Sequence, residues 1–180
     1  MIRSSFPRSG ARRFGRSQDG SSTIEFALFV PFFLMLFLSA FELGMLMARN
    51  VMLDRGVDIA VRELRLGTID PLNEVTLKAA ICDAAVIIPD CENQIRLEMR
   101  QLDPRNWAQI PNDADCIDRG DPGQPARDFA PTNNSNELVI LRACSLLDPF
   151  APFAALGSVL SENGTNPYEL VATTAYVVEP

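Results

Sequence analysis

The feature that most constrains this chain is a stretch without a charge, residues 26–41, which contains six of the eleven phenylalanines. A helix of sixteen residues is about 24 Å long, whereas the hydrocarbon core of a bilayer is about 30 Å thick. Apolar residues continue past Glu42, and a helix over residues 26–47 would reach about 33 Å. A buried core helix is the alternative, but the density of phenylalanine favours a membrane-spanning helix with Glu42 near one end.

The charges on the two sides of this stretch differ in sign. Residues 1–20 carry five arginines and one aspartate, and residues 48–180 carry a net charge of -9. Because basic segments beside a membrane helix stay in the cytoplasm, the N-terminus is expected to be cytoplasmic and the acidic remainder exported. The net charge of the whole chain, -7, argues against nucleic-acid binding, which needs clustered Lys and Arg.

The residues before the apolar stretch are typical of a processing site. Gly20 offers a protease an extended, unobstructed backbone, and a cut after it would give Ser21 a new α-amine. The carboxylate of Glu25 lies one helical turn after Ser21 and could pair with that amine, in its own chain or in a neighbouring one. An intramembrane carboxylate costs about 2–3 kcal/mol or more, so Glu25 is expected to have a function.

An ordinary secretory signal peptide is a second interpretation of the N-terminus. It fits poorly, because Glu25 stands where signal peptides avoid acids and the apolar run is long. The only candidate cleavage site, Ser39-Ala40-Phe41, is weak.

The basic leader, Gly20 and the pair Glu25-Phe26 together resemble the processing pattern of type IV prepilins. The longer run GSSTIEFALFVP, residues 20–31, is similar to the TadE-like family, the minor pseudopilins of the Flp (tight adherence, type IVb) pilus system. The similarity continues through FELG, residues 41–44, and covers roughly residues 18–65.

This resemblance implies a prepilin peptidase that cuts between Gly20 and Ser21, so that Glu25 becomes the fifth residue of the mature chain. It implies an assembly role without enzymatic activity or a cofactor, in a single-pass protein of the bacterial inner membrane whose head is periplasmic. The implied partners are the prepilin peptidase, other Flp pilins and pseudopilins, the inner-membrane secretion platform and the lipid bilayer. The long exported part favours a minor pseudopilin over the short fibre subunit.

Two other functions stay open. One is a membrane-anchored enzyme with an exported catalytic head, and the other is a secreted or bitopic periplasmic protein with an unrelated binding role. The chain has no histidine, which excludes His-based triads and HExxH zinc sites. It also has no CxxC pair, so no metal site is expected.

Two residues of the predicted membrane helix stand out. Pro31 removes a backbone hydrogen bond and is expected to kink the helix. Glu42 is expected to snorkel to the exported membrane surface. The helix should continue beyond the membrane and end before Gly67, over residues 24–66, because apolar residues repeat at helical spacing there, namely Leu53, Val57, Ala60, Val61 and Leu64.

The remainder, residues 67–180, is predicted to be an α+β head with a pilin-like plan, in which an antiparallel sheet of three or four strands packs on helices. A second helix is predicted over residues 71–86, with Asp70 as its N-cap and proline at its first position. A half-buried strand is predicted around residues 95–100, and further strands at residues 138–141 and 170–178.

The long segment over residues 103–136 is rich in proline, glycine, aspartate and asparagine, and is predicted to be a loop. Its acidic cluster is expected to be solvated and consists of Asp113, Asp115, Asp118 and Asp121. A short helix is predicted near residues 150–160.

Four cysteines, an even number, lie in the predicted exported head, where the compartment is oxidising. Three pairings are possible. We expect Cys82–Cys91, which brackets a helix end, and Cys116–Cys144, which ties the long loop to a strand. Each disulfide would stabilise the head by about 2–4 kcal/mol in the entropy model.

Overall fold

The computed structural model of the chain describes residues 21–103, 105, 111, 113–120, 128–131, 136–152, 159 and 166–178. The elements in chain order are α2 (Ser21–Arg65), α3 (Glu74–Ala84), α4 (Cys91–Gln94), β1 (Ile95–Leu102), β2 (Leu138–Leu147) and β3 (Tyr168–Val177). The leader with Gly20, and most of the short helix predicted near residues 150–160, lie outside the described residues.

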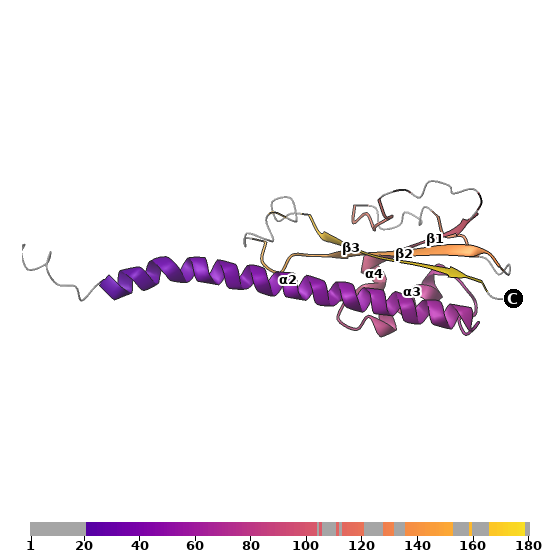
Figure 1. Cartoon of the computed structure of the whole chain (residues 1–180), viewed down its shortest axis with the longest axis horizontal. Coiled ribbons are helices and arrows are strands. Elements are labelled where there is room, and N and C mark those ends of the chain that lie inside the picture. The colour runs from indigo at the N-terminus through magenta and orange to yellow at the C-terminus, as the bar shows by residue number, and fades with distance from the viewer. Residues whose placement is uncertain are drawn as a thin grey trace, which may run out of the picture.

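One long helix and a small head make up the molecule (Figure 1). The N-terminal part of α2 extends beyond the head, and the sheet and the other helices gather along its C-terminal part (Figure 1). This arrangement confirms the predicted α+β fold with a long N-terminal helix.

The sheet is antiparallel, with the order β1-β2-β3 in the part of the chain that the structure describes. β2 is the central strand, and its Arg142 lies opposite Glu98 of β1 and Thr173 of β3. All three strands fall where the sequence predicts them. β2 is longer than the predicted four residues because it continues through Leu147.

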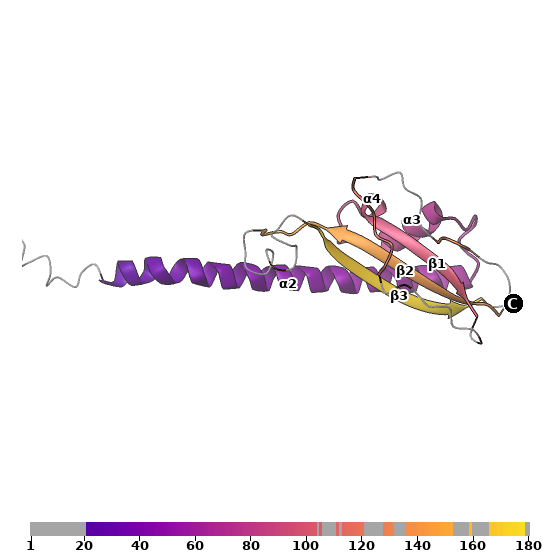
Figure 2. The ribbon, with the colours of Figure 1, turned by 90° about the horizontal axis from the view of Figure 1, so that it is seen from above.

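The hydrophobic core lies between one face of the sheet and the helices. Figure 2 shows the strands crossing α2 obliquely, so that the helix runs beneath the sheet over the length of the head. The predicted apolar face of α2 is buried here at Leu53, Val57, Ala60 and Val61. The other core residues include Leu77 and Ile81 of α3, Ile95, Leu97 and Met99 of β1, Val139 and Leu141 of β2, and Tyr168, Ala172 and Tyr176 of β3.

The close approach of α2 and α3 depends on Gly56. A Cβ atom at this position would lie 2.7 Å from the backbone oxygen of Ile81 and 3.2 Å from the Cβ atom of Ala85. Real Cβ contacts are not so short, so only glycine lets the two helices meet at this distance.

The end of α2 lies where the sequence predicts it, whereas the start of α3 does not. Gly67 has a φ of 66° and, with Thr68, donates its N–H to the last turn of α2, so the predicted glycine stop is confirmed. The predicted N-cap of the second helix, Asp70 followed by proline, is wrong. The helix begins later, because Asn73 accepts the Thr76 N–H at 2.9 Å and the Thr76 hydroxyl accepts the Asn73 N–H at 3.2 Å.

The face of the sheet that points away from α2 is also covered at β1, the strand that the sequence predicts to be half-buried. Arg96 and Glu98 of β1 are only 4% and 2% exposed. Glu98 lies between Arg100, whose Nε is 2.6 Å from Oε1, and Arg142, whose Nη1 is 3.5 Å from Oε2. The prediction that alternate residues of this strand face solvent is therefore wrong, because charged side chains are buried here as ion pairs.

The long segment before β2 supplies that cover. Asp115 is buried and lies 3.6 Å from Arg96, so the prediction of a solvated acidic cluster is wrong for this residue. The backbone oxygen of Pro111 accepts a hydrogen bond from Arg142 at 2.8 Å. Backbone hydrogen bonds of Met99 to Asp128 and Ala130 cover part of the outer edge of β1.

Candidate functional site: the apolar half of the long helix and its junction with the head

The residues predicted for processing lie at the start of α2. Ser21 is its first residue, and Glu25 and Phe26 follow in the next turn. Both of these side chains are exposed, and Glu25 makes no hydrogen bond or ion pair with the part of the chain that the structure describes. The Glu25 carboxylate is thus available to a group outside this part of the chain.

The N-terminal half of α2 is apolar over residues 26–41, and residues 22–37 are exposed except for the half-buried Val30. The exposed fraction is 69% at Phe26, 72% at Leu28 and 66% at Phe33. Among the described residues, α2 is the one helix that is long and apolar enough to cross a membrane, although a signal sequence would meet the same criterion. A helix of this kind needs lipid or other helices to cover it.

The helix is continuous through Pro31. Figure 1 shows a gentle curve in this half of α2 and no break. The missing N–H of Pro31 therefore does not divide the helix into two segments.

The second acid of the apolar half, Glu42, is buried at the junction of helix and head, with 2% exposure. Its Oε1 atom accepts the N–H of Phe150 at 2.8 Å and the hydroxyl of Tyr168 at 3.0 Å. The segment after β2 comes down onto the helix near its middle (Figure 1). The prediction that Glu42 snorkels is wrong, because two donors of the head bind its carboxylate.

The surroundings of Tyr168 at this junction keep its hydroxyl protonated. Burial, then the hydrogen bond to Glu42 and the charge of its carboxylate, raise the pKa of Tyr168 to about 12. The hydroxyl of Tyr168 therefore stays protonated, and able to donate, into alkaline solution. The other carboxylate oxygen of Glu42, Oε2, is buried without a hydrogen-bond partner among the described residues.

An aromatic pair lies beside this carboxylate. The rings of Phe41 and Phe150 meet edge to face with 5.5 Å between their centroids. The start of the segment that carries Phe150 is held by Arg119, whose Nη1 binds Asp148 at 2.5 Å and whose Nη2 binds Gln94 at 3.1 Å. No periodicity in the sequence signals these contacts, since they join residues far apart in the chain.

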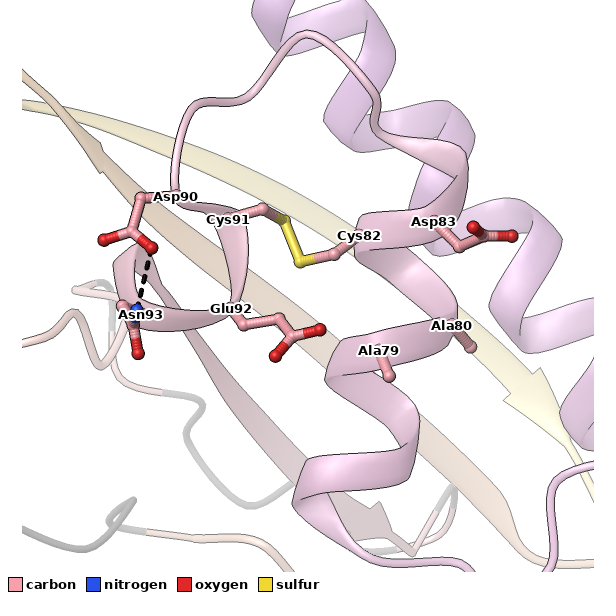
Figure 3. A pocket seen from close by; sticks show the side chains of 8 residues that line it. All are labelled: Ala79, Ala80, Cys82, Asp83, Asp90, Cys91, Glu92 and Asn93. Carbon is pink, nitrogen blue, oxygen red and sulfur yellow. Dashed lines mark hydrogen bonds between the residues drawn. A yellow bond between two sulfur atoms is a disulfide. The ribbon is translucent and has the colours of Figure 1, made fainter.

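The four cysteines form the expected disulfides, Cys82–Cys91 and Cys116–Cys144. The second disulfide ties the long segment to β2. Figure 3 shows the first, which joins α3 to α4 at one side of a shallow pocket. Acidic side chains surround that pocket without converging, since Glu92 points toward α3 while Asp83 and Asp90 point away from it (Figure 3).

No arrangement for a metal is found among the described residues, since no three His, Cys, Asp or Glu side chains are grouped to hold one. The candidate functional site is instead an exposed apolar surface. An apolar helix half leads to a head that is bound to it through Glu42.

The chain was compared with families, curated proteins and solved structures. No curated protein and no solved structure matches the chain. A family model described as TadE-like protein matches residues 20–62, which covers the residues predicted for processing, the apolar half of α2 and Glu42. This match confirms the resemblance predicted from the sequence and associates the chain with the tight adherence pilus system. Over residues 20–62, the chain is similar to the TadE-like family.

Proposed function

We propose that this protein is a minor pseudopilin that acts in the assembly of Flp (tight adherence, type IVb) pili. A prepilin peptidase cuts between Gly20 and Ser21, and α2 anchors the mature chain in the bacterial inner membrane. The basic leader faces the cytoplasm and the head lies in the periplasm. The units of this arrangement are the leader (residues 1–20), the long helix (residues 21–66) and the head (residues 67–180).

The observation that carries the proposal is the division of α2 into two unlike halves. The N-terminal half is apolar and largely exposed, whereas the C-terminal half is packed on the sheet. A helix half of the first kind is stable in lipid or among similar helices. The same surface therefore suits both the membrane before assembly and helix packing with other pilins and pseudopilins afterwards.

The processing residues support the assembly role. After cleavage, the α-amine of Ser21 and the carboxylate of Glu25 lie one helical turn apart in an apolar environment. There an unpaired carboxylate is costly, so Glu25 pairs with the amine of its own chain or of a neighbouring subunit. In this role the chain carries out no chemical reaction and needs no cofactor. Its partners are the peptidase, the secretion platform and the other pilus subunits.

N-terminal sequencing of the mature protein tests the proposal directly. A mature chain that starts at Ser21 supports the pseudopilin. A start near Phe41 would identify a secreted protein with a cleaved signal peptide, and an intact Met1 would identify a simple membrane anchor. Either of these results would overturn the proposal.

The role of Glu25 needs a second experiment. Glu25→Ala is expected to impair processing or pilus assembly while the head stays folded, and Glu25→Gln separates loss of charge from loss of size. Asp54→Ala is the matched control, because it removes an exposed acid from the same helix outside the processing site. Normal cleavage and normal piliation in Glu25→Ala would contradict the assigned role.

A further inference from the structure

An exposed aromatic pair, Phe41 of α2 and Phe150 of the head, lies where the head meets the apolar half of the helix. Phe41 is 46% exposed and Phe150 is 68% exposed. The position of Phe150 is fixed by its N–H, which binds Glu42 at 2.8 Å, and by its edge-to-face contact with Phe41. Two large aromatic side chains that are exposed beside an apolar helix indicate a surface that a membrane or another molecule covers.

The part of α2 that precedes the first contact with the head is too short to cross a membrane. Residues 31–37 are exposed, Leu38 and Ser39 are half-buried, residues 40–41 are exposed again, and Glu42 is the first buried residue. The uncovered helix over residues 21–37 is therefore about 25 Å long, against about 30 Å for the hydrocarbon core. Counted from Phe26, the first residue after the charged Glu25, it is only about 18 Å long.

The missing length must come from the turn of α2 that the head binds. A span of about twenty residues that starts at Phe26 ends near Met45, so Phe41 and Glu42 lie at the exported edge of the hydrocarbon. Any tilt of the helix brings this turn deeper. Since Phe150 is bound to the same turn, it lies at the same depth, where apolar side chains such as Phe, Trp and Leu are buried at the boundary of headgroups and acyl chains.

The single charge of this region is shielded from lipid. Glu42 is the only charged residue over residues 26–48, and its carboxylate is 2% exposed and accepts two hydrogen bonds from the head. The chain after Asp148 is uncharged over residues 149–160 and contains two phenylalanines. Val159 in this stretch is 76% exposed. The composition of the segment is thus compatible with contact to lipid.

We propose that Phe150 of the head and Phe41 of α2 form a lipid-contacting surface, which enters the interface of the exported leaflet. Glu42 is the positioning residue, because it fixes Phe150 on the membrane helix. The surface holds the head at one depth and one orientation before assembly. The proposal rests on the proposed function only in requiring that α2 spans a membrane.

Tryptophan fluorescence of the full chain in phospholipid vesicles tests this surface. The variant Phe150→Trp is made together with Trp107→Phe, so that the chain carries a single tryptophan. We expect blue-shifted emission, with stronger quenching by phospholipids brominated near the headgroup than by phospholipids brominated near the chain ends. The matched control is Val75→Trp in the same background, because Val75 is 75% exposed on α3. This control is expected to give emission typical of water and no quenching.

Bilayer thickness gives a second readout that a merely structural contact would not produce. In short-chain phosphatidylcholine the emission of the Phe150→Trp variant should shift toward the red as the head rises from the interface. In long-chain phosphatidylcholine it should shift toward the blue. Emission independent of thickness, without quenching, in protein that resists carbonate extraction would overturn the lipid surface while leaving the membrane anchor intact. Such a result would leave a neighbouring pilus subunit to cover the aromatic pair. Protein that carbonate extracts from the vesicles would overturn the anchor as well.

Discussion

Tyr168 donates a hydrogen bond from its hydroxyl to the carboxylate of Glu42 at 3.0 Å, across 126 residues of sequence. The same carboxylate oxygen accepts the N–H of Phe150. Phe150 follows β2 and Tyr168 begins β3, so one side chain of α2 holds both ends of the connection between these strands. The long helix and the head are thereby joined at a defined turn of the helix.

Loss of the Glu42 carboxylate should therefore destabilise the head. Glu42→Ala leaves two donors without an acceptor and is expected to lower the free energy of unfolding by about 2–4 kcal/mol. Glu42→Gln keeps an acceptor oxygen and should cost about 1 kcal/mol. Denaturant unfolding of the full chain in detergent micelles measures both, with the exposed Asp54→Ala as a control expected within about 0.5 kcal/mol of the parent. Equal stability of Glu42→Ala and the control would show that these hydrogen bonds do not hold the head.

The same contact predicts a loss of stability in alkaline solution. The pKa of Tyr168 is raised from 10.0 to about 12 in the folded state, so between these values the folded chain binds more protons than the unfolded chain. The contribution of Tyr168 is therefore fully present below pH 10 and is lost as the pH rises toward 12. Burial also raises the pKa of Tyr176.

Phenolate absorbance can separate the two tyrosines, the only ones in the chain. In Tyr176→Phe the remaining phenol is expected to titrate near 12 in the folded protein and near 10 after unfolding. Adding Glu42→Gln removes the charge and should lower the folded value. A midpoint near 10 in folded Tyr176→Phe would contradict the buried contact.

Gly56 and Gly44 offer a matched test of helix packing on α2. In Gly56→Ala the new methyl group meets the backbone oxygen of Ile81, and we expect a loss of about 1–3 kcal/mol. Nothing lies within 4 Å of a Cβ atom at Gly44, so Gly44→Ala should be neutral or stabilise the helix by up to about 1 kcal/mol. Thermal unfolding of the two variants, compared in the same micelles, gives the difference. A Gly56→Ala variant as stable as Gly44→Ala would mean that α3 can move away from α2 without cost.

The two disulfides should differ in what they contribute. The residues of Cys116–Cys144 are 28 apart and those of Cys82–Cys91 are 9 apart. The entropy model then gives about 3.6 kcal/mol for the first and about 2.6 kcal/mol for the second. Paired Cys→Ser variants, measured by denaturant unfolding, should show the larger loss for Cys116 and Cys144. Loss of the Cys116–Cys144 disulfide also releases the segment before β2 that covers the buried Arg96 and Glu98. This release should increase amide hydrogen exchange along β1.

Several parts of the molecule could be predicted from local sequence because their cause is local. Helical periodicity places the apolar face of α2, and Gly67 ends the helix because glycine adopts a positive φ without strain. The disulfide pairing follows from the positions of the cysteines at a helix end and on a strand. The start of α3 differs from the start that Asp70-Pro71 predicts, since the helix begins at the capping box of Asn73 and Thr76.

The burial of charged residues could not be predicted from local sequence. Alternation along β1 predicts solvent-facing Arg96 and Glu98, yet a distant segment covers them and pairs Arg96 with Asp115. Glu42 looks like an acid at a membrane surface, yet the head encloses it. In both places the cost of burying a charge is offset by partners that lie far away in sequence, and no short pattern contains them.

The sequence by itself determined the apolar helix, its resemblance to the TadE-like family and the order of α2, α3 and the three strands, because periodicity, charge and composition act over a few turns of chain. Only the tertiary structure decided where the head meets the helix. That choice depends on hydrogen bonds from Phe150 and Tyr168 to a single carboxylate, and such bonds form only when the sheet has brought their donors to Glu42.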